Sequence, residues 1–285
     1  ELLAAAASEE TIPFEKMRLL TELGECRMPQ GVPALVRALS DQHPGVRATA
    51  AHAIAIAGAD DTRSEDARKA LLANSEAIGR LQQLASDADP EVAAAAVVAL
   101  GTLQGPTSPA IEAALRSSVV PVLSAGISLA SRPEHAAMIA GRLDSIPTEL
   151  RAPAILAIGR CGDQAQGTLL VNRATGDNVV ETVAACQALA MLKHAPAAGQ
   201  LEKLTRAAHP SVRREAMRAF GQCSADRRIE LATAMLADND PTVRQAAVEV
   251  IGDNLVADAV ASLIPQLSTD YRPLYLATRK ALISA

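Results

Sequence analysis

Apolar residues recur at every fourth position in four similar segments of the chain. The segments read DQHPGVRATAAHAIA, DADPEVAAAAVVALG, AAHPSVRREAMRAFG and DNDPTVRQAAVEVIG, and they begin at residues 41, 87, 207 and 238. The positions two, six and ten residues after the shared proline are apolar in all four. A spacing of four places these side chains on one face of a helix. Each segment therefore predicts an amphipathic helix that begins at its proline, where the missing N–H is no loss.

The same spacing recurs more weakly along the rest of the chain. We call the place of the proline the reference position of a repeat and count offsets from it. Shorter apolar-periodic segments lie between the predicted helices, for example at 31–40 and 197–208. Each repeat is therefore predicted to be a helical hairpin of about 31 residues. The predicted reference positions are residues 13, 44, 90, 119, 148, 179, 210, 241 and 272.

One hairpin of this size cannot bury its own apolar face, whereas stacked hairpins can. We therefore predict an all-α fold, a right-handed α-solenoid of about nine hairpins that forms one domain over residues 1–285. The longer step between residues 44 and 90 leaves an insertion near 59–74, which is predicted to be a short helix capped by Ser64 or a plain long loop. The chain starts at Glu1 inside a helical pattern, so we expect a truncated N-terminus.

The composition agrees with close-packed helices and narrows the range of partners. The chain of 285 residues is 49% hydrophobic but contains only two Phe, two Tyr and no Trp. Its net charge of -5 argues against a nucleic-acid partner, because binding to phosphates requires a basic surface. No apolar run is long enough to span a membrane.

The recurring string D-x-x-P-x-V-R-x-x-A, followed by alanine and glycine at fixed offsets, resembles the HEAT repeat. It is most similar to the short bacterial type known as PBS-lyase HEAT-like. The resemblance covers nearly the whole chain and is strongest at reference positions 44, 90, 210 and 241. It implies an α-solenoid but no particular activity, since the family includes scaffolds, adaptors and a few enzymes.

The resemblance also implies a structural ladder, in which the arginine at offset 3 bonds to acids of neighbouring loops. A pattern that recurs in a row favours a structural role over a catalytic one. Ala93 occupies this offset in the third repeat, so the ladder is expected to be broken there. The basic positions are Arg47, Arg151, Arg213 and Arg244, with Lys16 similar, and the acidic positions are Asp41, Asp87 and Asp238.

Cysteines and histidines give no sign of catalysis or metal binding. The chain has no C-x-x-C and no H-E-x-x-H, and three of its four cysteines fall at offset 13 of separate repeats. Equivalent positions in stacked repeats lie roughly 10 Å apart per repeat, too far for a disulfide. We predict free and mostly buried thiols, which fits a reducing, cytoplasmic location. No catalytic residue, cofactor or metal is predicted. The cysteines are Cys26, Cys161, Cys186 and Cys223.

The resemblance implies that the second helix of each hairpin lines a concave groove. Offsets 4 and 8 lie opposite the buried stripe, so their side chains should face this groove. They read apolar in the central repeats and basic in the repeat that follows. This predicts a peptide or helix partner with an apolar anchor and acidic residues. The candidate partner-binding residues are Val98, Leu123, Ile127, Leu156, Val183, Arg214 and Arg218.

Several alternatives stay open. The reference position at residue 119 can be misaligned, or a first-helix segment or a second copy can cover the apolar stripe. The favoured function is a non-enzymatic scaffold or protein-interaction module. The alternatives are a HEAT-like enzyme or enzyme subunit, similar to bilin lyases or DNA glycosylases, and an architectural spacer in a longer protein.

Overall fold

The computed structural model describes residues 12–224, 227–254 and 257–284, and within these ranges every regular element is helical. Nine longer helices of the described ranges correspond to the nine predicted repeats. Eight of them begin at the predicted reference residue, and α9 begins one residue later. These helices are α2 (Pro13–Cys26), α4 (Pro44–Ala57), α7 (Pro90–Gln104), α9 (Val120–Leu129), α11 (Thr148–Arg160), α13 (Val179–Leu192), α15 (Pro210–Cys223), α17 (Pro241–Asp253) and α19 (Arg272–Ile283).

The remaining α-helices, which we call the shorter helices, lie between these nine, one in each interval except that α5 and α6 both lie between α4 and α7, and 3-10 turns adjoin several of them. The shorter α-helices are α3 (Val32–Ala38), α5 (Glu65–Ala73), α6 (Ser75–Leu84), α8 (Pro109–Arg116), α10 (Pro133–Ala140), α12 (Gly167–Arg173), α14 (Ala198–Leu204), α16 (Arg228–Met235) and α18 (Ala257–Leu263). The 3-10 turns are η1 (Pro29–Gly31), η2 (Gly105–Thr107), η3 (Leu143–Ser145), η4 (Gln164–Gln166), η5 (Ala195–Ala197) and η6 (Ile264–Ser268). The predicted all-α fold of helical hairpins is confirmed.

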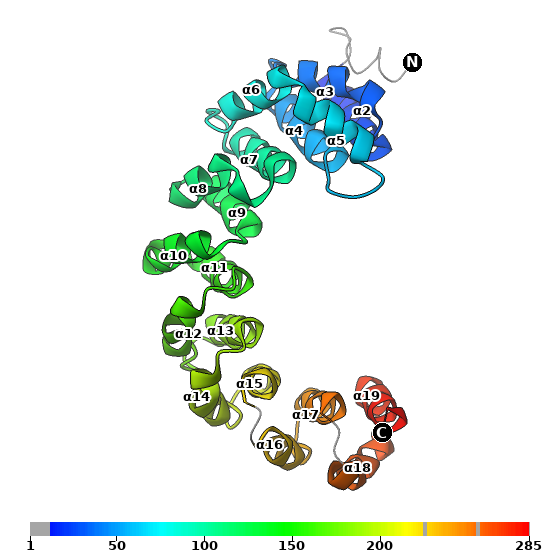
Figure 1. Ribbon diagram of the computed structural model, residues 1–285, viewed down its shortest axis with the longest axis vertical. Helices are drawn as coiled ribbons and strands as arrows, with labels where there is room; N and C mark the ends of the chain where they lie inside the picture. Colours follow the sequence, from blue (N-terminus) through cyan, green and yellow to red (C-terminus); the bar gives the residue numbers. More distant parts are fainter. Residues whose placement is uncertain (1–11, 225–226, 255–256, 285) are drawn as a thin grey trace. The chain divides into compact units, whose positions relative to one another are not determined.

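The chain divides into two compact units, Glu1–Ala130 and Ser131–Ala285. In the first unit the long helices α2, α4, α7 and α9 pack one on the next, and in the second unit α11, α13, α15, α17 and α19 do the same. The shorter helices form a second layer in each unit (Figure 1). The single domain and the right-handed winding stay predictions. The helical pattern at Glu1, on which the expectation of a truncated N-terminus rests, lies in residues 1–11, outside the described residues.

Capping residues explain why the long helices begin at their reference positions. Pro90 is the first residue of α7, and the carboxylate of Asp89 accepts hydrogen bonds from the N–H groups of Glu91 (2.9 Å) and Val92 (3.2 Å). The carboxylate of Asp240 caps α17 in the same way. Such a cap stabilises a helix by about 1 kcal/mol. The Asp-Pro pairs at 89–90 and 240–241 are therefore genuine helix starts.

Neighbouring long helices touch through the glycine at offset 11. A Cβ on Gly159 would lie 2.5 Å from the Cα of Ala188, which stands at offset 9 of the following repeat. Gly221 faces Val250 in the same way. The absence of a side chain thus lets successive helices approach closely. The same pairing of offset 11 with offset 9 occurs at Gly24 with Ala53 and at Gly252 with Ala281.

This pairing corrects the predicted register of α9. Gly101, at offset 11, faces Leu129, which is at offset 9 only if the reference position is Val120 rather than residue 119. Leu123 and Ile127 are consequently not exposed groove residues, because their exposed fractions are only 2% and 3%. Two valines in succession, residues 119 and 120, left the register ambiguous in the sequence.

The corrected register gives α9 the same pattern of burial as the other long helices. Offsets 4 and 8 are now Ser124, which is half-buried, and Ser128, which is exposed. Offsets 2, 6 and 10 become Val122, Gly126 and Ala130, all buried. The apolar groove predicted in the central repeats is therefore interrupted by two serines at α9.

The insertion near 59–74 contains the short helix α5, so the first of the two predicted alternatives is confirmed and the plain loop is not. Ser64 is its N-cap residue, but its hydroxyl accepts a hydrogen bond from Arg27 (3.0 Å) instead of capping the helix. Arg68 of α5 donates to the carbonyl oxygens of Gly58 (2.6 Å) and Leu103 (3.0 Å). The inserted helix thereby joins the C-terminal ends of α4 and α7.

Candidate functional site

The arginines at offset 3 form the predicted ladder. Arg47 donates two hydrogen bonds to the carboxylate of Asp87 (3.1 and 3.0 Å) and a third to the carbonyl oxygen of Asp41 (3.1 Å). Arg213 does the same with Asp238, at 2.8 Å for each bond. Each guanidinium therefore joins its own loop to the loop of the next repeat. Bidentate pairs of this kind are among the stronger ionic contacts in proteins.

The other ladder positions vary in strength. Lys16 bonds to Asp41 at 2.9 Å, and Arg151 forms a longer ion pair with Glu181 at 3.8 Å. Arg244 bonds to carbonyl oxygens of its own loop. Ala93 is buried and has no cationic group, so the ladder is broken in the third repeat as predicted. The ion pairs of Lys16, Arg47, Arg151 and Arg213 thus connect successive repeats.

The pKa values of the ladder acids are lowered by their partners. The hydrogen bond from Arg213 is the main cause that lowers the pKa of Asp238 below its ordinary 3.8. For Asp87, burial acts to raise the pKa, but hydrogen bonds from the Asp89 backbone and from Arg47 outweigh it. A carboxyl group whose pKa is lowered by folding stabilises the fold above its ordinary pKa. That contribution disappears as the pH falls through the lowered value.

Replacing Asp238 with asparagine should remove this contribution. We expect Asp238→Asn to lower the free energy of unfolding by about 1–3 kcal/mol at pH 7, because Arg213 loses its bidentate partner. The difference from wild type should shrink below about pH 4, where Asp238 of the unfolded chain begins to take up a proton, and should disappear once the pH is below the lowered pKa of the folded protein. Urea unfolding at the two pH values measures this. Asp177→Asn, at an exposed position, is the matched control. Equal destabilisation by both substitutions at pH 7 would contradict the role of the ladder.

The cysteines are free thiols, as predicted. Cys161, Cys186 and Cys223 are buried and Cys26 is exposed. Burial, together with the negative charge of Glu215, raises the pKa of Cys186 to about 12. Burial raises the pKa of Cys223 to about 11. These buried thiols are therefore protonated at neutral pH and are poor nucleophiles.

The described residues contain neither a metal-binding cluster nor a membrane-spanning helix. Within the described ranges, no three His, Cys, Asp or Glu side chains lie together as a metal site would require. None of the helices in these ranges combines the length and the apolar character needed to cross a bilayer.

A hollow of about 650 Å³ lies over the C-terminal halves of four successive long helices of the second unit. Its lining comes mostly from offsets 8, 9 and 12 of α11, α13, α15 and α17, with Ala190 at offset 11 and Glu215 at offset 5. Leu156 and Met191 provide apolar side chains, and Met191 is 56% exposed. Gln187 and Gln222 add neutral amides. The hollow thus combines the apolar side chains of Leu156 and Met191 with a polar floor, and the exposed Arg160 of α11 belongs to the same lining.

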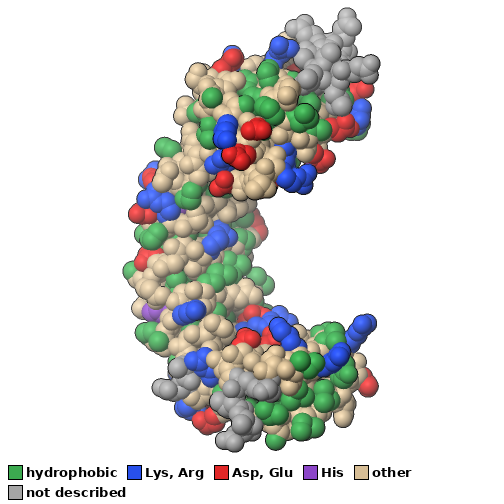
Figure 2. All heavy atoms as spheres, turned by 45° about the vertical axis from the view of Figure 1, so that its right-hand side comes forward, with side chains coloured by type: hydrophobic (Ala, Val, Ile, Leu, Met, Phe, Trp, Pro, Cys, Tyr) green, Lys and Arg blue, Asp and Glu red, His purple; other side chains and the backbone are tan. Residues whose placement is uncertain are grey.

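An ion-pair network forms that polar floor. Glu215 is nearly buried and accepts hydrogen bonds from Arg214 (2.8 Å) and Arg218 (3.1 Å). Arg218 also bonds to Glu249 (2.8 Å), to which Gln245 donates at 2.7 Å. Two guanidinium groups and two carboxylates therefore balance. On the face of the second unit that Figure 2 presents, basic and acidic side chains lie next to one another.

The structure places the seven predicted site residues in four different environments. Leu156 and Arg218 line the hollow, whereas Val183 and Arg214 are half-buried nearby, on α13 and α15. Val98 is half-buried in α7 of the first unit. Leu123 and Ile127 are buried, as described above. The seven residues therefore do not form one continuous exposed stripe.

Met191 was missed by the sequence reasoning. It lies at offset 12, one helical turn beyond offset 8, and therefore on the same face of α13. Extending the groove rows by one turn would have identified it. It is an exposed large apolar side chain within a hollow, and such a side chain is typical of a contact surface.

Comparison with known proteins identifies the repeat family. A model of HEAT repeats matches residues 1–75 and 197–283, which together are more than half of the chain. No curated protein matches the sequence. The described helices and this match agree with the repeat pattern seen in the sequence.

Solved structures of similar fold include three that share low sequence identity with this chain. They are Kap95p with RanGDP (15% identity, TM-score 0.64), importin beta (16%, 0.60) and a Kap121p mutant (13%, 0.53). The comparisons cover 99%, 99% and 98% of this chain but 44%, 44% and 36% of the other chains. The chain thus spans less than half the length of each. The likeness shows a common solenoid fold, and the family match supplies the assignment: the chain belongs to the HEAT repeat family.

Proposed function

We propose that this protein is a non-enzymatic interaction module that binds a peptide or an amphipathic helix in the hollow of the second unit. The observation that supports this most directly is Met191, a 56% exposed apolar side chain beside Leu156 in a hollow built by four successive helices. Burial of an exposed methionine by a partner contributes about 1.5–3 kcal/mol. An apolar anchor with a polar surround is the usual arrangement of a peptide-binding groove.

The hollow gives weaker support for an acidic partner than for an apolar one. Arg214 and Arg218 were expected to attract acidic residues, but both already pair with Glu215, and Arg218 also pairs with Glu249. An acidic partner residue would have to compete with these carboxylates. The apolar anchor is therefore the main element of the proposal, and an acidic complement is the secondary one.

The proposal also covers the type of HEAT repeat, the class of partner and the cellular compartment. The repeat length of about 31 residues supports assignment to the short bacterial, PBS-lyase HEAT-like type. A balanced floor of charges in the hollow, together with the net charge of -5, supports a protein partner rather than a nucleic acid. Free buried thiols support a cytoplasmic location.

Removing the apolar patch tests the proposal. Peptides enriched from a displayed random library on the wild-type protein should bind the Leu156→Ser/Met191→Ser double variant about 10- to 100-fold more weakly. Fluorescence anisotropy with the enriched peptides measures the dissociation constants. Val180→Ser is the matched control, because Val180 is a 65% exposed residue of the same helix, α13, that does not line the hollow.

The result that would overturn the proposal is equal affinity of the enriched peptides for wild type and the double variant. A thermal unfolding curve of the double variant shows that any loss of binding is not a loss of folding. Equal weakening by Val180→Ser would also count against the proposal, since it would place the peptide elsewhere on α13.

A further inference from the structure

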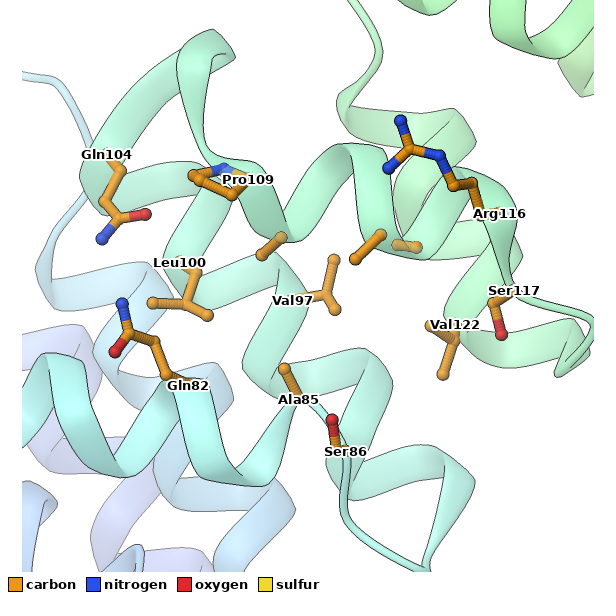
Figure 3. A pocket seen from close by; sticks show the side chains of 13 residues that line it. Gln82, Ala85, Ser86, Val97, Leu100, Gln104, Pro109, Arg116, Ser117 and Val122 are labelled. Atoms are coloured by element: carbon orange, nitrogen blue, oxygen red, sulfur yellow. The ribbon is translucent and has the colours of Figure 1, made fainter.

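A second hollow lies in the first unit, on the side where the shorter helices α6 and α8 flank α7 (Figure 3). Its volume is about 470 Å³, within the range of small-ligand sites. Val97 and Leu100 of α7 form an apolar floor. The walls are built largely from alanines, such as Ala110 and Ala113, whose small side chains leave the space between the helices unfilled.

Polar side chains stand at the two ends of this hollow. In Figure 3, Gln82 and Gln104 lie at one end, and Arg116 and Ser117 lie at the other. The amide oxygen of Gln104 accepts a hydrogen bond from Ser108 (2.8 Å), which leaves the amide N–H groups of Gln104 to donate. Each primary amide can donate and accept, as a peptide group does.

Among the residues that line this hollow, Arg116 is the one that carries a charge. Its present partner is Glu112 on the same helix, at 3.2 Å, with exposed fractions of 65% and 41% for the two side chains. An exposed pair at this spacing is among the weakest ionic contacts, so Arg116 can exchange Glu112 for another carboxylate at little cost. The half-buried bidentate pair of Arg47 with Asp87 cannot exchange so easily.

We propose that the hollow between α6 and α8 binds the free C-terminus of a polypeptide that ends in an aliphatic residue. The terminal carboxylate pairs with Arg116, and the aliphatic side chain rests on Val97 and Leu100. A peptide group meets the amides of Gln82 and Gln104. This site is in the first unit and does not depend on the groove proposed for the second.

A peptide fits the lining better than a simple aliphatic acid does. Both have an apolar body and a carboxylate, and both would satisfy the floor and Arg116. An alkyl chain, however, has no hydrogen-bonding group for the amides at the opposite end, and covering those amides without partners would be unfavourable. A peptide brings an N–H and a C=O to that end.

Binding of defined probes tests this site. The probes are a short fluorescein-labelled peptide that ends in leucine with a free carboxylate, the same peptide with a C-terminal amide, and octanoate as a competitor. We expect the free acid to bind about tenfold more tightly than the amide, because the amide cannot pair with Arg116. Octanoate should compete poorly with the peptide.

Three variants locate the binding. Ala113→Phe fills the hollow from an exposed position, and Arg116→Gln removes the cation without adding bulk. Each should weaken binding of the free acid about tenfold or more. Arg80→Gln is the matched control, since Arg80 is an exposed arginine of α6 that pairs with Glu76 and does not line the hollow. It should bind as wild type does.

The proposal is overturned if the acid and the amide bind equally, if octanoate binds and the peptide does not, or if Ala113→Phe and Arg116→Gln bind the acid as wild type does. Thermal unfolding of the two variants separates loss of the site from loss of folding. Arg116→Gln changes only an exposed side chain, so its result stands even if Ala113→Phe disturbs α8.

Discussion

Replacing Leu123 or Ile127 with aspartate is expected to abolish stable folding around α9. Both side chains are almost fully buried, with exposed fractions of 2% and 3%. An unpaired carboxylate at such a position costs several kcal/mol, or forces the helix out of its place. The whole stability of a typical domain is only about 5–15 kcal/mol, so the cost is a large part of the total.

Ser124→Asp is the matched substitution on the same helix. Ser124 is half-buried and occupies offset 4 in the corrected register, so its carboxylate would remain hydrated. We expect a change within about 1 kcal/mol. Circular dichroism during thermal and urea unfolding compares the three variants. If Leu123→Asp unfolded like wild type and Ser124→Asp did not, Val120 would not be the reference position of α9.

Gly159→Ala is expected to be the most damaging single-methyl change in the second unit. The added Cβ would lie 2.5 Å from the Cα and 2.7 Å from the Cβ of Ala188. Both are fixed within α13, so α11 and α13 would have to separate. Overpacking of this kind costs about 1–3 kcal/mol, and the better helix propensity of alanine returns only about 1 kcal/mol.

Gly199→Ala is the control for that gain in propensity. Gly199 also lies in a helix, α14, but no atom lies within 4 Å of an added Cβ. This variant should be as stable as wild type or more stable, by up to about 1 kcal/mol. Urea unfolding midpoints measure both. If Gly159→Ala were stabilised to the same extent, close contact at offset 11 would not be the reason that glycine stands there.

The repeat arrangement could be predicted from the sequence because the same marker residues recur at the same offsets in several repeats. The proline, the valine two residues later and the arginine at offset 3 recur together, so an error in one repeat is corrected by its neighbours. In the fourth repeat those markers are missing. Val119, Val120 and Pro121 fit two registers equally well, and the contact of Gly101 with Leu129 was needed to choose between them.

The candidate site was less predictable, because exposure and pairing depend on neighbouring helices. Nothing in the order of residues indicated that Glu215 would be buried between two arginines, or that Arg218 would reach Glu249 in the next repeat. The hollow between α6 and α8 depends on the small volume of facing alanines, which the apolar pattern does not distinguish from larger residues. Met191 was predictable in principle, since the helical period alone places it on the groove face.

Site-specific photo-crosslinking tests most directly whether the second unit holds a partner. A benzoylphenylalanine placed at Met191, inside the hollow, is compared in cells with one at Lys203, an exposed residue of α14 in the outer layer. The proposed function predicts a discrete crosslinked protein from position 191 that is absent from position 203 and is lost with Leu156→Ser. The same crosslinks from both positions, or none from position 191 while position 203 gives a discrete product, would contradict it.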